Sequence, residues 1–272
     1  MAWLDNPRMP VKKSPKPSAP APRELPEVHF SDHGDVRCLH LGATEWIQGS
    51  MLMDDPYTLD LEYVQRMMAW LLFVPPTSVS KRHAMQLGLG AAALTKFCHK
   101  KLRMKTTVIE LNPQVVAACR GWFRLPLDND KLQVIIEDAE QAVQDSRWHG
   151  TVDALQVDLY DHEAAGPVLD GEDFYAHCRQ MLTDDGCMTV NLFGRDSSYE
   201  RSLQTLARVF GPEAVWAFKP TREGNTVVLA QRTPLRPPRE VLAERSETIQ
   251  TRWGLPATKW MRVFKPLATS TP

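Results

Sequence analysis

The feature that most constrains the fold is a repeated alternation of strand-like and helix-like segments through the middle of the chain. Repeated strand–helix–strand units predict an α/β fold with a parallel, doubly wound sheet. The final two strands are separated only by a short turn, so an antiparallel hairpin is expected at the sheet edge. The expected strands are 83–87, 105–110, 132–137, 152–157, 187–193, 213–219 and 226–231, and the expected helices are 91–101, 113–122, 139–145, 172–182 and 198–209.

A different pattern precedes this alternation. Short alternating segments at 36–41 and 46–52 are bounded by turn residues, which predicts a small antiparallel β unit. The segment 59–73 carries apolar residues near helical spacing and is followed by two prolines, which predicts an amphipathic or buried helix.

Charge and composition exclude several classes of protein. There are 32 basic and 33 acidic side chains, a formal net charge of -1, so no overall field favours nucleic acid or an anionic membrane. The longest apolar run, 67–74, is far shorter than the roughly 20 residues that span a bilayer. No secretory signal pattern is visible, and the five cysteines include no C-x-x-C pair. We expect a cytoplasmic protein with reduced thiols and neither nucleic acid nor membrane as a partner.

The first strand of the alternating region runs into the sequence G-L-G-A-A-A at 88–93, which fits a G-x-G-x-x-A turn. Gly88 and Gly90 let the backbone approach a ligand, and the following helix offers free N–H groups. Glu110 ends the next strand, where its carboxylate can accept hydrogen bonds from both ribose hydroxyls. A nucleoside-containing ligand is therefore predicted.

Dinucleotides and S-adenosylmethionine-type nucleosides both suit this layout. Asp138 closes the third strand and is followed by Ala139, a place where a carboxylate and a backbone amide can recognise the adenine ring. The closing hairpin also belongs to the S-adenosyl class. We favour that class and keep an NAD-dependent enzyme as the weaker alternative.

The fourth strand ends in Q-V-D-L-Y-D-H-E at 156–163, which places three carboxylates and an imidazole at the ligand-binding edge of the sheet. A carboxylate there can accept a proton from an attacking amine or hold a cationic substrate. For Asp158, the alternative is a loop-ordering role. A metal site built from Asp158, Asp161 and His162 is conceivable, but no metal is expected because no other metal-ligand spacing accompanies it.

Taken in order, these motifs resemble the polyamine aminopropyltransferase (spermidine synthase) family over about residues 28–231. The resemblance implies a class I S-adenosylmethionine-dependent transferase fold, with a mostly parallel seven-stranded sheet. It also implies transfer of an aminopropyl group from decarboxylated S-adenosylmethionine to a diamine such as putrescine, with release of methylthioadenosine. The matching residues are the segment 31–42, Gln48, Tyr63, Gly88, Gly90, 110–113, Asp138, Ala139, 158–161 and 173–175.

By this resemblance, Gly88, Gly90, Glu110, Asp138 and Ala139 bind the nucleoside. Asp158 is the base that frees the attacking amine, and the expected contacts to the polyamine are Gln48, Tyr63, Asp161 and Arg222. A diamine carries two positive charges near neutral pH, so carboxylates and aromatic faces suit it. A homodimer is expected because the small β unit leaves strand edges that can pair across a two-fold axis.

Two positions depart from the family pattern. Ala91 replaces an aspartate that binds the amino group of the propyl arm and repels the carboxylate of intact S-adenosylmethionine. Arg222 replaces a tyrosine, and its guanidinium would repel a diamine and attract a carboxylate. These departures keep two alternatives open: a methyltransferase that uses intact S-adenosylmethionine on an unknown acceptor, and a non-catalytic paralogue that only binds the nucleoside.

The expected organisation has four parts. Residues 1–26 hold seven of the 21 prolines and are expected to form a disordered leader. The small β unit with its helix spans 27–76, and the Rossmann-like catalytic domain spans 77–232. A tail at 233–272 is expected to pack on the surface, with one helix at 239–253.

Overall fold

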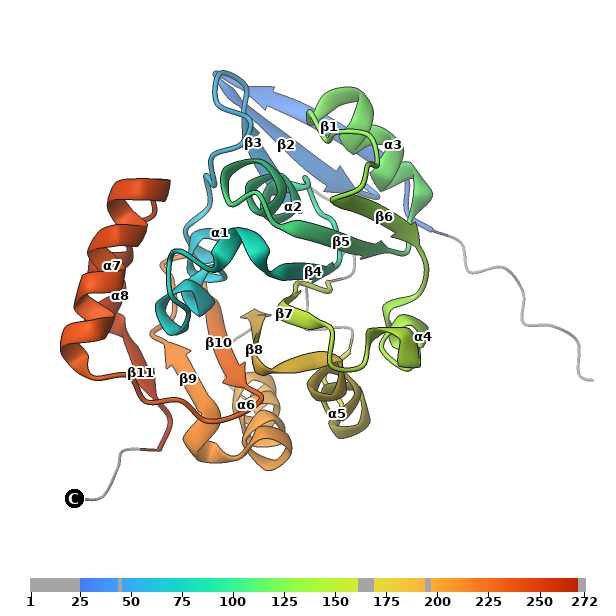
Figure 1. Ribbon diagram of the computed structural model, residues 1–272. Helices are drawn as coiled ribbons and strands as arrows, with labels where there is room; N and C mark the ends of the chain where they lie inside the picture. The colour runs from blue at the N-terminus through green and yellow to red at the C-terminus, as the bar shows by residue number, and fades with distance from the viewer. Residues whose placement is uncertain (1–24, 44–45, 161–168, 194–196, 269–272) are drawn as a thin grey trace, which may run out of the picture.

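The computed structural model describes residues 25–43, 46–160, 169–193 and 197–268 (Figure 1). They form an α/β fold with a large sheet of eight strands and a separate sheet of three. From one edge, the large sheet runs β6, β5, β4, β7, β8, β10, β9, β11. Its strands are β4 (His83–Leu87), β5 (Lys105–Glu110), β6 (Leu132–Ile136), β7 (Val152–Val157), β8 (Leu182–Phe193), β9 (Val215–Phe218), β10 (Asn225–Gln231) and β11 (Phe264–Pro266).

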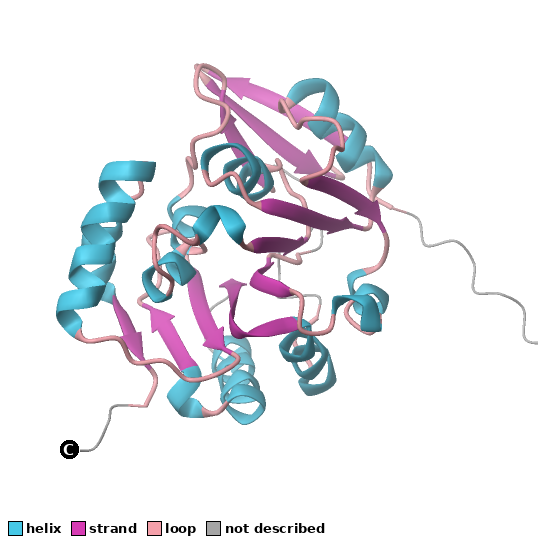
Figure 2. Cartoon of the chain, in the orientation of Figure 1, coloured by secondary structure: helices cyan, strands magenta, loops and turns pink. Residues whose placement is uncertain are grey.

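The parallel sheet expected from the alternating pattern is confirmed. Strands β6, β5, β4, β7 and β8 pair in parallel, and β10 pairs antiparallel with both β8 and β9 (Figure 2). The hairpin is not at the edge, however, because the C-terminal segment adds β11 against β9. The rings of Phe218 and Phe264 stack across that pairing at 4.4 Å, so apolar contact holds the eighth strand in place.

The small sheet contains β1 (Val28–His33), β2 (Val36–Leu41) and β3 (Gly49–Leu52), which pair antiparallel in that order. The strand expected at 46–52 begins at Gly49, three residues later than predicted, and β1 adds a strand that was not predicted. One face of this sheet buries Leu39 and Met51 in a cluster with Val108 of β5 and Val115 of helix α3 (Pro113–Trp122). The small sheet is thus packed onto the large domain, beside the glycine turn.

Helices cover both faces of the large sheet (Figure 1). Two helices expected from the sequence are divided. The segment 59–73 forms α1 (Glu62–Arg66) and a 3-10 turn (Ala69–Phe73). The segment 91–101 forms α2 (Ala93–Lys96) and a π turn (Phe97–Lys101). Within the described residues, no helix is both long and apolar enough to cross a membrane. The helices besides α3 are α1 (Glu62–Arg66), α2 (Ala93–Lys96), α4 (Ala139–Ala142), α5 (Glu172–Met181), α6 (Ser197–Phe210), α7 (Arg239–Trp253) and α8 (Ala257–Val263).

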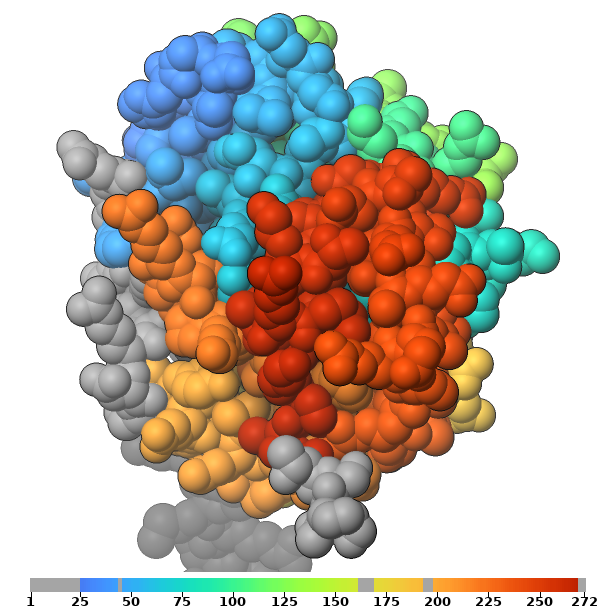
Figure 3. All heavy atoms as spheres, turned by 90° about the vertical axis from the view of Figure 1, so that its left-hand side faces the viewer, coloured from blue at the N-terminus to red at the C-terminus, as the bar shows by residue number. Residues whose placement is uncertain are grey.

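The C-terminal helices α7 and α8 are part of the packed structure. They form a broad area on one side of the molecule (red in Figure 3). Leu242, Ile249 and Trp260 are buried in the same cluster as Trp70 and Phe73 of the segment after α1. The segment expected to lie on the surface therefore also completes the core beneath α1, the helix that carries Tyr63.

The contact between the small sheet and the glycine turn is close enough to be tested by mutation. A Cβ on Gly49 of β3 would lie 2.8 Å from the backbone nitrogen of Ala91 and 2.9 Å from its Cβ. Gly49→Ala is therefore expected to lower the free energy of unfolding by about 1–3 kcal/mol, because the turn must shift to make room. Urea unfolding measures this change.

Gly121→Ala is the matched control. A Cβ at Gly121, which lies in α3, would meet no atom within 4 Å. Alanine is a better helix former than glycine, so this variant should be neutral or more stable by up to about 1 kcal/mol. A Gly49→Ala protein as stable as Gly121→Ala would contradict the packing described here.

Candidate active site

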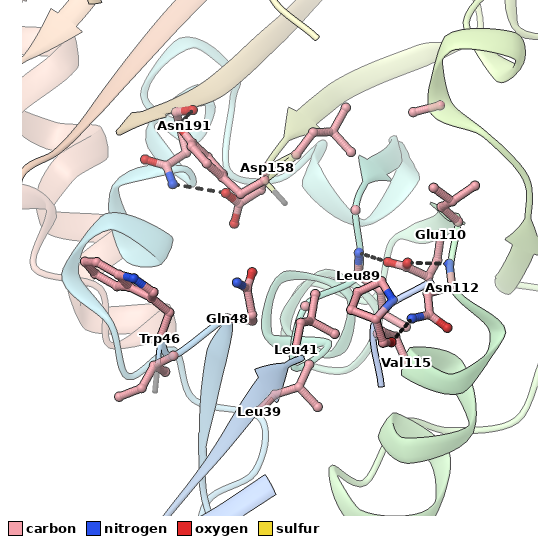
Figure 4. A pocket seen from close by; sticks show the side chains of 18 of the residues that line it. Leu39, Leu41, Trp46, Gln48, Leu89, Glu110, Asn112, Val115, Asp158 and Asn191 are labelled. Carbon is pink, nitrogen blue, oxygen red and sulfur yellow. Dashed lines mark hydrogen bonds between the residues drawn. The ribbon is translucent and has the colours of Figure 1, made fainter. Parts of the chain in front are cut away.

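A cavity of about 1810 Å³ lies at the carboxyl ends of β4, β5 and β7 (Figure 4). The small sheet and α1 contribute the opposite part of its wall. Chain segments far apart in sequence meet here because the parallel strands all end at this edge. Eight residues singled out from the sequence line the cavity: Gln48, Tyr63, Gly88, Gly90, Glu110, Asp138, Ala139 and Asp158.

Gly88 permits the close approach of two strand ends. Its φ is +90°, and a Cβ there would lie 2.4 Å from the backbone oxygen of Asp158, so only glycine fits. The Asp158 amide in turn donates to the carbonyl of Leu87, 3.0 Å away. The glycine turn after β4 and the acidic residue after β7 are thereby fixed against each other.

Glu110 is held by backbone amides. Its Oε2 accepts from the Leu89 N–H at 2.9 Å and its Oε1 accepts from the Asn112 N–H at 2.8 Å, as the dashed lines in Figure 4 show. Burial raises the pKa of Glu110 above its ordinary value, although these hydrogen bonds oppose the rise. The carboxylate has a fixed orientation, and each oxygen keeps a lone pair for a further donor.

Asp138 has a structural role as well as a place in the cavity. It is the N-cap of α4, and its Oδ1 accepts from the Glu140 N–H at 2.9 Å. Capping satisfies one free amide at the helix start and engages only one of the two carboxylate oxygens. Ala139, the first residue of α4, lines the cavity beside it.

Asp158 is the buried carboxylate of the site. Its Oδ1 accepts from Asn191 Nδ2 at 3.0 Å, and its Oδ2 accepts from the Tyr63 hydroxyl at 3.3 Å. Burial raises the pKa of Asp158 to about 6, against the effect of both hydrogen bonds. Burial, with the nearby Asp158 charge, also raises the pKa of Tyr63, so the phenol stays a donor. A carboxylate in a cavity with a pKa near neutrality is suited to accept a proton.

The cavity is strongly acidic. Nine of the described residues that line it carry carboxylates. No lysine, arginine or histidine is among the described lining residues. Because the chain as a whole is nearly neutral, this acidity is concentrated at one place. Such a cavity attracts cations and repels anions. The nine acids are Glu27, Asp60, Glu62, Glu110, Glu137, Asp138, Glu140, Asp158 and Glu223.

The structure separates Arg222 from the other expected substrate residues that it describes. Arg222 is exposed and does not line the cavity, whereas its neighbour Glu223 does. The expected repulsion between Arg222 and a diamine is therefore weaker than the sequence indicated. Asp161 lies outside the described residues. Gln48 lines the cavity. Its backbone N–H donates to the backbone carbonyl of Leu39 at 2.8 Å, which ties this residue to β2.

Several lining residues were not identified from the sequence, among them Asp60, Asn191, Glu223 and Asn225. Asn191 is a polar residue within an apolar strand and Asp60 a charged residue within an apolar segment, which are signals that could have marked them. Asp60 accepts from the Ser50 hydroxyl at 2.7 Å, so it joins the start of α1 to β3.

Comparisons with known proteins identify the family of the chain. The family model described as "Spermine/spermidine synthase domain" matches residues 88–225. A polyamine aminopropyltransferase from Neisseria meningitidis is 33% identical over 255 residues, covering 93% of this chain and 93% of that protein.

Two solved structures share the fold. A probable spermidine synthase from Corynebacterium glutamicum has a TM-score of 0.69 at 18% identity, covering 88% of this chain and 87% of that one. Human Methyltransferase-like protein 13, solved in complex with SAH, has a TM-score of 0.60 at 20% identity, covering 78% and 96%. The fold class predicted from the sequence is confirmed. Because the family model and the identity over most of the chain agree, this protein belongs to the spermine/spermidine synthase family of polyamine aminopropyltransferases.

Proposed function

We propose that this transferase moves an aminopropyl group from decarboxylated S-adenosylmethionine to a diamine such as putrescine, and releases methylthioadenosine. The observation that carries the proposal is the acidic cavity without a basic side chain among its described residues. Both proposed substrates are cations, and their charges match this lining.

The nucleoside half of the cavity supports adenosine binding. The two oxygens of Glu110 are oriented by backbone amides and keep lone pairs for the two ribose hydroxyls. Asp138 and the backbone amide of Ala139 are proposed to recognise the adenine edge. Gly88 and Gly90 line the cavity without a side chain, which leaves the backbone of the turn open to the nucleoside.

Charge favours the decarboxylated nucleoside over the intact one. Intact S-adenosylmethionine carries a carboxylate, and no described side chain of the cavity offers a cation to pair with it. Ala91 is buried and does not line the cavity. The alanine that replaces the family's aspartate therefore leaves no gap in the described cavity lining. The ammonium of the propyl arm is instead compensated by the surrounding carboxylates.

Asp158 is proposed as the base. It accepts a proton from the ammonium of the acceptor, and the resulting amine attacks the propyl carbon next to the sulfonium. A carbon–nitrogen bond forms while the carbon–sulfur bond breaks, and its electron pair neutralises the sulfur, so methylthioadenosine leaves uncharged. Tyr63 and Asn191 hold the two oxygens of Asp158 in place for this transfer.

Two finer proposals complete this assignment. We propose a cytoplasmic location, and a homodimer formed through the small sheet, in which β1 is an edge strand. Light scattering on the purified protein measures its oligomeric state. A monomer at all concentrations would refute the homodimer.

The function is tested by incubating the protein with putrescine and decarboxylated S-adenosylmethionine and measuring methylthioadenosine by chromatography. Asp158→Asn should lower kcat by about 10²–10⁴-fold, because it removes the proton acceptor. Asp184→Asn, the same change at a side chain that is 95% exposed, is the matched control and should leave turnover unchanged. A folded wild-type protein that forms no product, or that instead transfers a methyl group from intact S-adenosylmethionine, would overturn the proposal.

The pH dependence follows from the raised pKa of Asp158. A base must be ionised to act, so kcat/KM should fall as pH drops through about 6, the pKa of this carboxyl. An unburied aspartate would give this fall near pH 4. A profile of kcat/KM from pH 4.5 to 8 that stays flat down to pH 5 would show that Asp158 is not the titrating base.

Neighbouring residues test which side chain faces the acceptor. Glu223→Gln removes a charge from the cavity lining and should raise KM for the diamine about five- to tenfold, with a smaller effect on kcat. Arg222→Gln changes the exposed neighbour and should alter KM less than twofold. The opposite ranking would place Arg222 at the substrate, as first expected from the sequence.

A further inference from the structure

A chain of three polar side chains runs from the β9–β10 loop to Asp158. Asn225 Nδ2 donates to Asn191 Oδ1 at 3.2 Å, and Asn191 Nδ2 donates to Asp158 Oδ1 at 3.0 Å. The residues lie at the start of β10, in β8 and after β7. Both asparagines are buried, with 9% and 3% of their surface exposed.

Chemistry fixes the direction of these hydrogen bonds. An ionised carboxylate only accepts, so Asn191 must turn its NH₂ group toward Asp158. Its Oδ1 then points away and requires a donor, which Asn225 Nδ2 supplies. Without that donor the buried Oδ1 of Asn191 would have no hydrogen bond, and the side-chain amide would no longer be held in this orientation by a second partner.

We propose that Asn225 is a positioning residue that acts through Asn191 to hold the Asp158 carboxylate in its productive orientation. The role of Asp158 as a base rests on the proposed function, whereas the positioning is a property of the hydrogen-bond chain. The backbone of Asn225 is held by Thr221: its backbone N–H donates to Thr221 Oγ1 at 3.2 Å, and its backbone carbonyl accepts from the Thr221 N–H at 2.7 Å.

The same loop is joined to the second donor of Asp158. Arg66 of α1 donates to the Lys219 carbonyl at 2.6 Å and forms an ion pair with Glu62 at 2.5 Å. Helix α1 also carries Tyr63, whose hydroxyl donates to Asp158. Arg66 thus ties the helix that carries Tyr63 to the loop between β9 and Asn225, so the loop that presents Glu223 is joined to one donor of Asp158 directly and to the other through Asn225.

Several charged or titratable groups act on Asp158 from the surrounding elements. Tyr63 donates to Asp158 from α1. The hydroxyl of Tyr160, which follows β7, donates to the backbone carbonyl of Asn191 at 2.8 Å and not to its side chain. The other carboxylates of the cavity lining have the same sign as Asp158 and, when ionised, offer it no hydrogen-bond donor: Glu27, Asp60, Glu62, Glu110, Glu137, Asp138, Glu140 and Glu223. None of these groups replaces Asn191 at Oδ1, so loss of the asparagine chain leaves that oxygen without its donor.

The test measures the titration of Asp158 directly, from the ¹³C carboxyl resonance in protein labelled at aspartate and assigned with Asp158→Asn. Asn225→Leu removes the donor at nearly constant volume, and should move the midpoint to higher pH and lower kcat about fivefold, with KM for the diamine changed less than twofold. Asn225→Asp replaces the donor with an acceptor when ionised and should give a larger upward shift, about one pH unit.

Asn129→Asp adds the same charge in an exposed turn and should leave the Asp158 midpoint in place. Asn191→Leu removes the direct donor, so the Asn191→Leu, Asn225→Leu double variant should titrate like Asn191→Leu alone. Additive shifts, or an unchanged midpoint in both Asn225 variants with wild-type melting temperatures, would refute the relay. Because this readout requires no turnover, a protein that makes no methylthioadenosine would refute the base assignment and leave the relay result standing. Should one Asn225 variant fail to fold, the other decides.

Discussion

The buried carboxylate of Asp158 is the group on which the arrangement of the site depends. It can sit against the end of β4 only because Gly88 leaves room for its backbone oxygen. Once buried, the carboxylate resists ionisation, and this resistance is what brings its pKa close to neutrality. Tyr63 and Asn191 then supply donors from two different elements, so burial and orientation are achieved together.

The rest of the cavity acts on a ligand through charge. The carboxylates that line it attract cations, and a bound sulfonium or ammonium group is opposite in charge to its surroundings. Selection by charge therefore accompanies selection by shape. The residues outside these nine acids carry a net positive formal charge, so the remainder of the chain does not compete for a cationic substrate.

Much of the fold was predictable because its central strands are buried on both faces. Strands β4, β5 and β7 have the predicted limits, since each is a segment of five or six residues that alternates with helix-like segments along the chain. Strand β11 has only three residues and pairs with β9, about fifty positions earlier, so no local pattern marks it. The sequence predicted a helix at 59–73 but not its division into two parts, because apolar spacing does not distinguish an α-helix from a 3-10 turn.

The site shows a similar division. Residues that follow strands in parallel, such as Glu110, Asp138 and Asp158, could be identified because the end of each strand fixes their place. Asn191 and Asn225 gain their meaning only from pairing between β8 and β10, and their side chains meet diagonally across that pairing. The loop before β10 shows the limit most clearly: a difference of one position puts Glu223, and not Arg222, at the cavity.

If a cavity rich in carboxylates selects its nucleoside by charge, decarboxylated S-adenosylmethionine should bind more tightly than the intact form. Calorimetric titration of the purified protein with each of the two nucleosides measures this preference. We expect the decarboxylated form to bind at least about tenfold more tightly, a difference of about 1.4 kcal/mol, and the preference to shrink as salt is added. Equal affinity, or tighter binding of the intact nucleoside, would contradict it.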